Sequence, residues 1–134
     1  MIVVDTNTIV YLLIPGKNSR QAEKLFKQDS VWSVPRLWRS EFRNVLIKYV
    51  RAEYITFDHS LRLMQSAEDL FEEREFEVNS DNILEISYLS KCSSYDTEFV
   101  ALARELRTYL ITWDKKLIQQ FPDLAVSAED YLKS

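Results

Sequence analysis

Hydrophobic residues occur along the chain either in short continuous runs or at steps of three and four positions. The short runs are rich in β-branched residues and predict strands, whereas the longer periodic segments predict helices. The predicted strands cover residues 2–4, 31–34, 76–78, 109–112 and 124–126. The predicted helices cover residues 18–28, 38–50, 58–71, 80–89, 95–106, 116–120 and 128–132. Strands that alternate with helices indicate an α/β fold with a central, mainly parallel sheet of about five short strands, flanked by helices.

Particular residues mark where some of these elements begin and end. Pro35 ends the second predicted strand and leaves the following segment free to turn into a helix. Asp58 is expected to cap the helix over residues 58–71, and Ser80 or Asp81 the helix after it. The reason is that a polar side chain just before a helix accepts hydrogen bonds from its free backbone N–H groups.

The composition is that of one domain with a substantial core. The chain has 134 residues, of which 46% are hydrophobic and 13% aromatic, enough for one core but not for two. One glycine and three prolines leave no flexible linker, so we expect a single domain over residues 1–134. The single cysteine, Cys92, excludes an intrachain disulfide. Without a signal peptide or a long apolar stretch, we expect a reduced, cytoplasmic protein that does not associate with membranes.

The charge of the chain limits how it could bind nucleic acid. A net charge of −4 and a pI of about 5.1 argue against binding through overall charge. Positive charge is nevertheless concentrated between residues 36 and 51. Such a run is by default a solvated helix face. If the protein binds RNA, Arg36, Arg39 and Arg43 are the candidates for contacts with the flanking phosphates.

Four acidic residues stand where a parallel sheet forms its binding site. Asp5 follows the first predicted strand and Asp114 the fourth, and both positions lie at the carboxyl edge of such a sheet. Glu41 and Asp96 lie in the first turns of helices, where each borders the apolar stripe of its own helix. Helices that follow strands begin at that same edge. We therefore expect the four carboxylates to converge.

Carboxylates a few ångströms apart cannot all stay ionised unaided. Either several are protonated or a divalent cation neutralises them. The only histidine, His59, lies away from these motifs, so the ligands would all be oxygens, which favours Mg²⁺ or Mn²⁺ over zinc. Any one of the 21 acidic residues, taken alone, is more simply a solvated side chain or a helix cap. The combination of four placements is what favours a metal site.

The segments around these acids resemble the PIN domain, a small metal-dependent nuclease fold typified by the VapC-like toxins of bacterial and archaeal toxin–antitoxin pairs. The similarity extends over nearly the whole chain and rests on four segments in order, Met1–Asn7, Pro35–Leu46, Tyr95–Ala103 and Leu110–Leu117. The resemblance implies a three-layer fold. The site that it implies consists of the acids Asp5, Glu41, Asp96 and Asp114, with Asn7 and Thr112 orienting the carboxylates.

With that resemblance, the leading hypothesis is an endoribonuclease that depends on Mg²⁺ or Mn²⁺ and hydrolyses RNA phosphodiester bonds without a protein nucleophile. Asp5 and Asp96 would be the principal metal ligands, and Asp114 a further ligand, directly or through water. Glu41 would be a ligand or the base that orients the attacking water. VapC-like proteins are usually homodimers inhibited by a small antitoxin whose tail covers the site. The resemblance thus implies a homodimer and a cognate antitoxin.

Two other functions fit parts of the pattern. One is a PIN-like module that acts mainly by binding a protein, with a vestigial acidic site as the dock for a basic peptide. The other is a phosphoryl-transfer domain of the receiver or haloacid-phosphatase kind, which also has an Asp after its first strand and binds Mg²⁺. The phosphatase kind requires a second Asp where this chain has Asn7, and the receiver kind requires an acid where Val78 and Asn79 stand.

Overall fold

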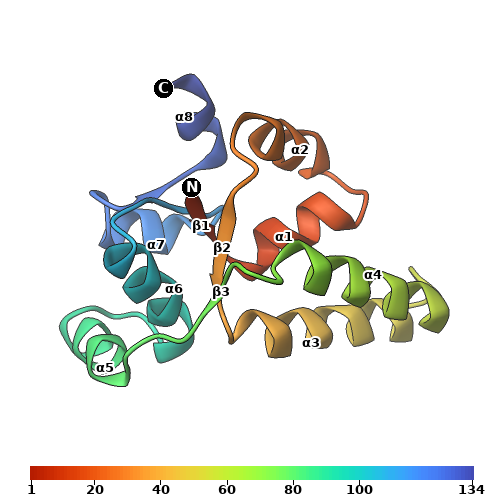
Figure 1. Cartoon of the computed structure of the whole chain (residues 1–134), viewed down its shortest axis with the longest axis horizontal. Coiled ribbons are helices and arrows are strands. Elements are labelled where there is room, and N and C mark those ends of the chain that lie inside the picture. Colours follow the sequence, from red (N-terminus) through yellow and green to blue (C-terminus); the bar gives the residue numbers. More distant parts are fainter.

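Five parallel strands form the central layer of the fold, which is given by a computed structural model of residues 1–134 (Figure 1). The strands are β1 (Ile2–Val4), β2 (Trp32–Pro35), β3 (Glu75–Phe76), β4 (Leu110–Ile111) and β5 (Ala125–Val126). Their order in the sheet is β3-β2-β1-β4-β5, and every pairing is parallel. The prediction of a parallel sheet of about five short strands between helices is therefore confirmed.

Eight helices surround this sheet. They are α1 (Thr6–Leu13), α2 (Ser19–Gln28), α3 (Trp38–Arg51), α4 (Phe57–Leu70), α5 (Ser80–Leu89), α6 (Ser94–Glu105), α7 (Lys115–Gln120) and α8 (Ala128–Lys133). None of them combines the length and the apolarity needed to span a bilayer. The sequence pattern does not predict α1, because an apolar run from Ile9 to Leu13 fills its second half and hides the three- and four-residue spacing.

The sheet separates two hydrophobic cores. Successive residues of a strand point to opposite faces, so Ile2 and Val4 of β1 join a core formed with α1 to α4, whereas Val3 joins one formed with α5 to α7. All three side chains are fully buried. Figure 1 shows the result as three layers, with α3 and α4 side by side and extending away from the sheet.

The strand order determines where a site can form. From the central strand β1 the chain builds β2 and β3 on one side and β4 and β5 on the other. The direction of winding changes between β1 and β4, and ligands of open α/β sheets bind in the crevice beyond the carboxyl ends of the strands at such a point. Asp5 follows β1 directly and Asp114 lies just after β4, so both flank this crevice.

Two predicted helix caps are wrong by one or two residues. Thr56, not Asp58, caps α4, because its hydroxyl accepts a hydrogen bond from the His59 backbone at 3.1 Å. Asn79 caps α5 by accepting hydrogen bonds from the second and third residues of that helix, Asp81 and Asn82. In both cases the polar residue predicted as the cap already belongs to the first turn of the helix. Acidic side chains are common there because the positive end of the helix dipole stabilises them.

Arg107 gives a test of backbone strain at the end of α6. This residue has a φ of 55°, a left-handed conformation that favours glycine, and the N–H group of Thr108 closes the helix on the Ala103 carbonyl at 3.0 Å. We expect Arg107→Gly to raise the free energy of unfolding by about 0.5–1 kcal/mol, because glycine adopts this conformation without strain. Urea denaturation measures the change. Arg104→Gly, within α6, should instead destabilise by about 1 kcal/mol, and equal effects of both changes would contradict the interpretation.

Candidate active site

Asp5 is fixed at the junction between β1 and α1 by two threonines. As the N-cap of α1, its Oδ1 accepts hydrogen bonds from the backbone N–H of Thr8 at 3.1 Å and from the Thr8 hydroxyl at 2.7 Å. Its Oδ2 accepts a hydrogen bond from the Thr112 hydroxyl at 2.6 Å. Both threonine side chains are fully buried, so the orientation of the Asp5 carboxylate is determined by rigid parts of the fold.

Thr112 connects Asp5 with the next acid across the crevice. The Thr112 hydroxyl also accepts a hydrogen bond from the backbone N–H of Asp114 at 3.0 Å. Asp114 is the N-cap of α7, and its Oδ1 accepts hydrogen bonds from the backbone of Lys116 at 2.8 Å and of Leu117 at 3.4 Å. Thr112 thus contacts the carboxylate of Asp5 and the backbone of Asp114, and its role in orienting carboxylates stays a prediction.

Glu41 and Asp96 approach from the two helices predicted to carry them. Glu41 lies in the first turn of α3, and its Oε1 accepts a hydrogen bond from the Thr6 hydroxyl at 2.6 Å. Asp96 lies in the first turn of α6, where its backbone N–H donates to the hydroxyl of the capping residue Ser93 at 3.2 Å. Both carboxyl side chains are partly buried.

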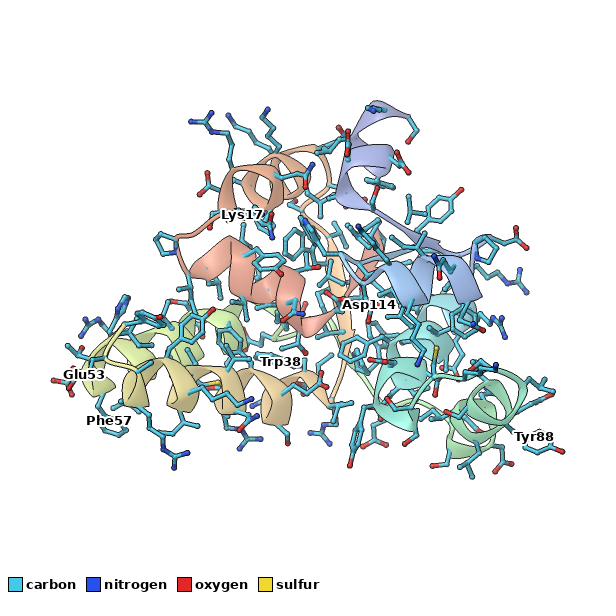
Figure 2. The ribbon with its side chains drawn as sticks, turned by 180° about the vertical axis from the view of Figure 1, so that it is seen from behind. Lys17, Trp38, Glu53, Phe57, Tyr88 and Asp114 are labelled. Atoms are coloured by element: carbon cyan, nitrogen blue, oxygen red, sulfur yellow. The ribbon has the colours of Figure 1, made fainter.

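These elements bring the four acids to one pocket of about 240 Å³. The polar and charged residues that line it are Asp5, Thr6, Asn7, Glu41, Asn44, Asp96 and Asp114. Figure 2 shows Asp114 near the centre of the molecule, between the helical layers. The arrangement predicted from the ends of strands and the beginnings of helices is thus the one observed, and the roles of the residues stay predictions.

Burial and mutual repulsion raise the pKa of three of the four carboxyl groups. Burial is the main cause of the raised pKa of Asp5. The hydrogen bonds from Thr112 and Thr8 oppose the shift, and the charge of Asp114 adds to it. Burial also raises the pKa of Asp96, to which the charge of Asp114 contributes, while Lys116 and the hydrogen bond from Ser93 act in the opposite direction. The pocket therefore holds negative charge that its own protein partners do not neutralise.

Glu41 has the most acidic surroundings of the group. Its pKa is raised by burial first, and then by the charges of Asp96, Asp5 and Glu98, while the Thr6 hydrogen bond opposes the shift. Glu98 is a fifth acid near the pocket that the sequence reasoning missed. It has a raised pKa of its own through burial, opposed by a hydrogen bond from the Leu37 backbone. Residues two apart on a helix do not share a face, so the spacing of Glu98 from Asp96 within α6 gave no signal for it.

The residues of the pocket fit a hard divalent cation, although they do not form a ready-made cage. No three acidic, histidine or cysteine side chains lie close enough together to enclose a metal ion as they stand. Mg²⁺, however, usually keeps several waters and is held by one or two carboxylates together with substrate phosphates. An open pocket with only oxygen donors and raised carboxyl pKa values suits that mode of binding.

The three arginines predicted to contact RNA have different surroundings. Arg39 forms ion pairs with Glu68 and with Glu75, the latter at 2.6 Å, and these contacts raise the pKa of Arg39. Arg36 pairs with Glu75 at 3.5 Å and with Glu77 at 3.2 Å. Arg43 is exposed and donates a hydrogen bond to the Arg39 carbonyl. Arg36 and Arg39 therefore already have acidic partners within the fold.

The fold is that of a known class of proteins. The PIN domain matches this chain over residues 2–123, and the chain belongs to that family. The resemblance inferred from the four sequence segments is confirmed.

Particular relatives extend the comparison. Ribonuclease VapC3 of Pyrobaculum aerophilum is 26% identical over 126 residues, which cover 92% of this chain and 96% of the relative. Among solved structures, PAE2754 from Pyrobaculum aerophilum superposes with a TM-score of 0.76 at 19% identity, covering 98% of this chain and 86% of that one. A toxin–antitoxin complex from Klebsiella pneumoniae gives a TM-score of 0.71 at 18% identity, with coverages of 96% and 98%. These two structures share the fold of this chain.

Proposed function

We propose that this PIN-domain protein is an endoribonuclease that depends on Mg²⁺ or Mn²⁺ and serves as the toxin of a toxin–antitoxin pair. The observation that carries the proposal is the pocket lined by all four acids at the point where the winding of the sheet changes direction. The relative named Ribonuclease VapC3 supports RNA as the substrate. The neighbouring toxin–antitoxin complex supports an inhibitory protein partner.

In this proposal each acid has a defined task. Asp5 and Asp96 hold the cation, and Asp114 completes the site directly or through water. Once bound, Mg²⁺ or Mn²⁺ would activate water and stabilise the charge that develops on the scissile phosphate and the leaving oxygen. Asn7, exposed at the rim of the pocket, is placed to orient a carboxylate or a water by hydrogen bonding.

Glu41 is proposed as the group that orients the attacking water and accepts its proton. A general base works best when its pKa lies near the working pH, and the pKa of Glu41 is raised toward that range by burial and by its acidic neighbours. The hydrogen bond from Thr6 at 2.6 Å holds the carboxylate in place. An acid that is fixed in orientation and retains its proton affinity suits this role.

The proposed partners follow from the same site. An antitoxin with an Arg or Lys in its covering segment would place a positive charge among the carboxylates and block the pocket, because charge-assisted hydrogen bonds to carboxylates are strong. A homodimer and a cytoplasmic location are proposed with it.

The direct test is incubation of purified, partner-free protein with cellular RNA, in Mg²⁺ and in EDTA. We expect cleavage in Mg²⁺ only, and none from an Asp96→Asn variant. Asp123→Asn, a change to an exposed acid outside the pocket, is the matched control and should cleave normally. Intact RNA in all samples, despite a folded protein, would favour the alternative of a protein-binding module with a vestigial acidic site.

Thr6 provides a separate test of the role of Glu41. Thr6→Val removes the hydroxyl that contacts the Glu41 carboxylate and leaves the shape nearly unchanged. We expect cleavage to fall roughly 10–100-fold, the usual effect of losing a group that orients a metal-site carboxylate. The acidic limb of the pH–rate profile should also move to higher pH, because removing a hydrogen bond to the ionised form raises the pKa of Glu41.

Thr6→Ser keeps a hydroxyl and is the control for this change. It should retain most of the activity and the original acidic limb. A pH profile that is the same for all three proteins would mean that the Glu41 carboxylate does not act as the base.

A further inference from the structure

Outside the acidic pocket, one concavity of the surface is strongly basic. It lies between α2 and α8, has a volume of about 950 Å³, and is lined by ten residues, of which one is hydrophobic and one acidic. Its basic residues, which we call the basic face, are Lys17, Arg20, Lys24, Lys27 and Lys133. The whole chain carries a net charge of −4, so this concavity has the opposite sign to the molecule as a whole.

Helical spacing aligns four of these residues. Lys17, Arg20, Lys24 and Lys27 follow one another at steps of three, four and three, which places them in one stripe along α2 and the residues just before it. The stripe extends over roughly 15 Å at 1.5 Å per residue. All four side chains are exposed. Like charges at this spacing destabilise a helix slightly, so the stripe does not serve the stability of α2.

The same four residues form no ion pair within the protein. The ion pairs of the fold involve the N-terminus, Arg36, Arg39 and Lys133, the last with Glu129 at 3.3 Å. Arg36 and Arg39 are therefore neutralised locally, whereas the stripe on α2, like the single exposed Arg43, has no acidic partner. Unpaired cations gathered in one concavity are the electrostatic footprint of a polyanion.

We propose that the basic face is a second RNA contact that binds the backbone phosphates of a folded RNA, away from the bond that is cut. The proposal rests on the proposed ribonuclease function. Lysine, arginine and amide side chains are the groups that contact phosphates in nucleic-acid complexes, and Asn18, Gln21 and Gln28 line the concavity beside the cations.

The lining of the basic face favours RNA over an acidic protein, and a helical stem over a single strand. Protein interfaces depend on buried aromatic or aliphatic anchors, and Leu132 is the only hydrophobic residue here. Single strands bind by stacking bases on aromatic rings, and none lines this concavity. The basic face can therefore contact only the phosphate backbone of the RNA. Such contacts recognise the shape of the RNA and not its sequence.

The distance between the acidic pocket and the basic face determines how long an RNA must be to contact both. Asp5 caps the beginning of α1, and Lys17 follows the end of this eight-residue helix, so roughly 12 Å of helix lies between them. Figure 2 shows Lys17 beyond α1 and well away from Asp114. A short oligonucleotide can occupy the pocket without reaching the basic face. A stem–loop RNA is long enough to reach both the pocket and the basic face.

The test compares two RNAs with two triple variants. One variant carries Arg20→Gln, Lys24→Gln and Lys27→Gln. The control carries Arg62→Gln, Lys91→Gln and Arg107→Gln, which removes the same charge from exposed residues on other elements that form no ion pair. Binding of a fluorescent stem–loop is measured by anisotropy against salt concentration in an Asp5→Asn background, so that no cleavage occurs. Cleavage is measured with the parent site intact. Circular dichroism verifies that both variants are folded.

We expect the basic-face variant to bind the stem–loop at least 10-fold more weakly. The slope of log affinity against log salt should become less steep by roughly 0.7–0.9 for each phosphate that the variant no longer binds. The KM for stem–loop cleavage should rise with kcat unchanged, and cleavage of a short oligonucleotide should stay the same. The control should match the parent in every assay. A third variant, with Lys24→Arg and Lys27→Arg and with Arg20 intact, keeps all the positive charges and should bind the stem–loop as tightly as the parent.

Equal stem–loop affinity and salt slope in the two triple variants would overturn the proposal, as would tighter binding of polyglutamate than of RNA to the basic face. Equal reductions in affinity for the stem–loop and the short oligonucleotide would overturn it too, because the basic face would then not be remote from the pocket. Failure of the ribonuclease function is separately visible, since the parent would then cut neither RNA while the anisotropy measurement still reports on the basic face.

Discussion

Replacing Asp5 by asparagine is expected to lower RNA cleavage by more than about 100-fold and to leave the protein folded. Removing a group that only orients a metal ligand costs roughly 10–100-fold, and Asp5 is itself proposed as a principal ligand. Asparagine keeps the size of the side chain. Its oxygen can still accept hydrogen bonds from Thr8, and its NH₂ group can donate to the Thr112 hydroxyl once that hydroxyl rotates.

The Asp5→Asn variant should also be at least as stable as the parent when metal is absent. Burial raises the pKa of Asp5 above its ordinary value of 3.8, so the fold disfavours the ionised form. Stability contributed by this group is therefore present at low pH and decreases as the pH rises from 3.8 through the raised pKa. Asparagine removes that decrease, and thermal unfolding in EDTA at neutral pH measures the gain.

The decisive comparison is with Asp123→Asn, which makes the same chemical change at an exposed acid outside the pocket. If Asp5→Asn alone abolishes cleavage while its stability is retained or increased, Asp5 contributes to function and not to folding. A fully active Asp5→Asn protein would refute the assignment of the site. Abolished cleavage caused by unfolding would appear in circular dichroism and would leave Asp5 a structural residue.

The second large effect concerns the cation. We expect Mg²⁺ or Mn²⁺ at about 100 times its dissociation constant to stabilise the fold by about 2.7 kcal/mol. For a chain of this length that corresponds to a rise in Tm of roughly 10 °C. The gain arises because a bound dication removes the repulsion among carboxyl groups whose pKa values are raised.

The pH dependence of this stabilisation follows from the direction of those shifts. The cation binds ionised carboxylates, so its effect should be complete above the raised pKa values of Asp5, Glu41 and Asp96 and should decrease as the pH falls through them. Thermal unfolding with Mg²⁺ and with EDTA over a pH series measures it. Asp96→Asn should respond less to Mg²⁺ than Asp123→Asn does. Identical Tm values with and without Mg²⁺ at neutral pH would contradict a metal site in this pocket.

Much of the fold was predictable because it depends on local patterns. The short apolar runs became strands, fully buried in β1, β2 and β4, and the periodic segments became helices. The prediction for β3 was displaced by one residue, to 76–78 from the observed Glu75–Phe76. The rule that parallel strands end at one edge then placed Asp5 and Asp114 together without any structure. The helix α1 was missed because its apolar residues are consecutive and show no spacing.

The details that were missed depend on contacts between distant segments. The pairing of Arg39 with Glu75 requires β3 to lie beside β2, a register that the chain between them does not encode in any local pattern. The hydrogen bond from Thr6 to Glu41 likewise depends on how α1 packs against α3. Residues 35 apart in sequence meet only when the whole sheet is assembled.

The threonine hydroxyls leave Asp5 and Glu41 with different numbers of carboxylate oxygens that lack a hydrogen bond. Each oxygen of Asp5 already receives a hydroxyl proton, one from Thr8 and one from Thr112. Glu41 receives only one, on Oε1, and its Oε2 is left without a protein donor. A proton released by water in this pocket thus has an open acceptor on Glu41 and crowded acceptors on Asp5. Of these two acids, Glu41 is therefore the one that has a carboxylate oxygen free to accept that proton.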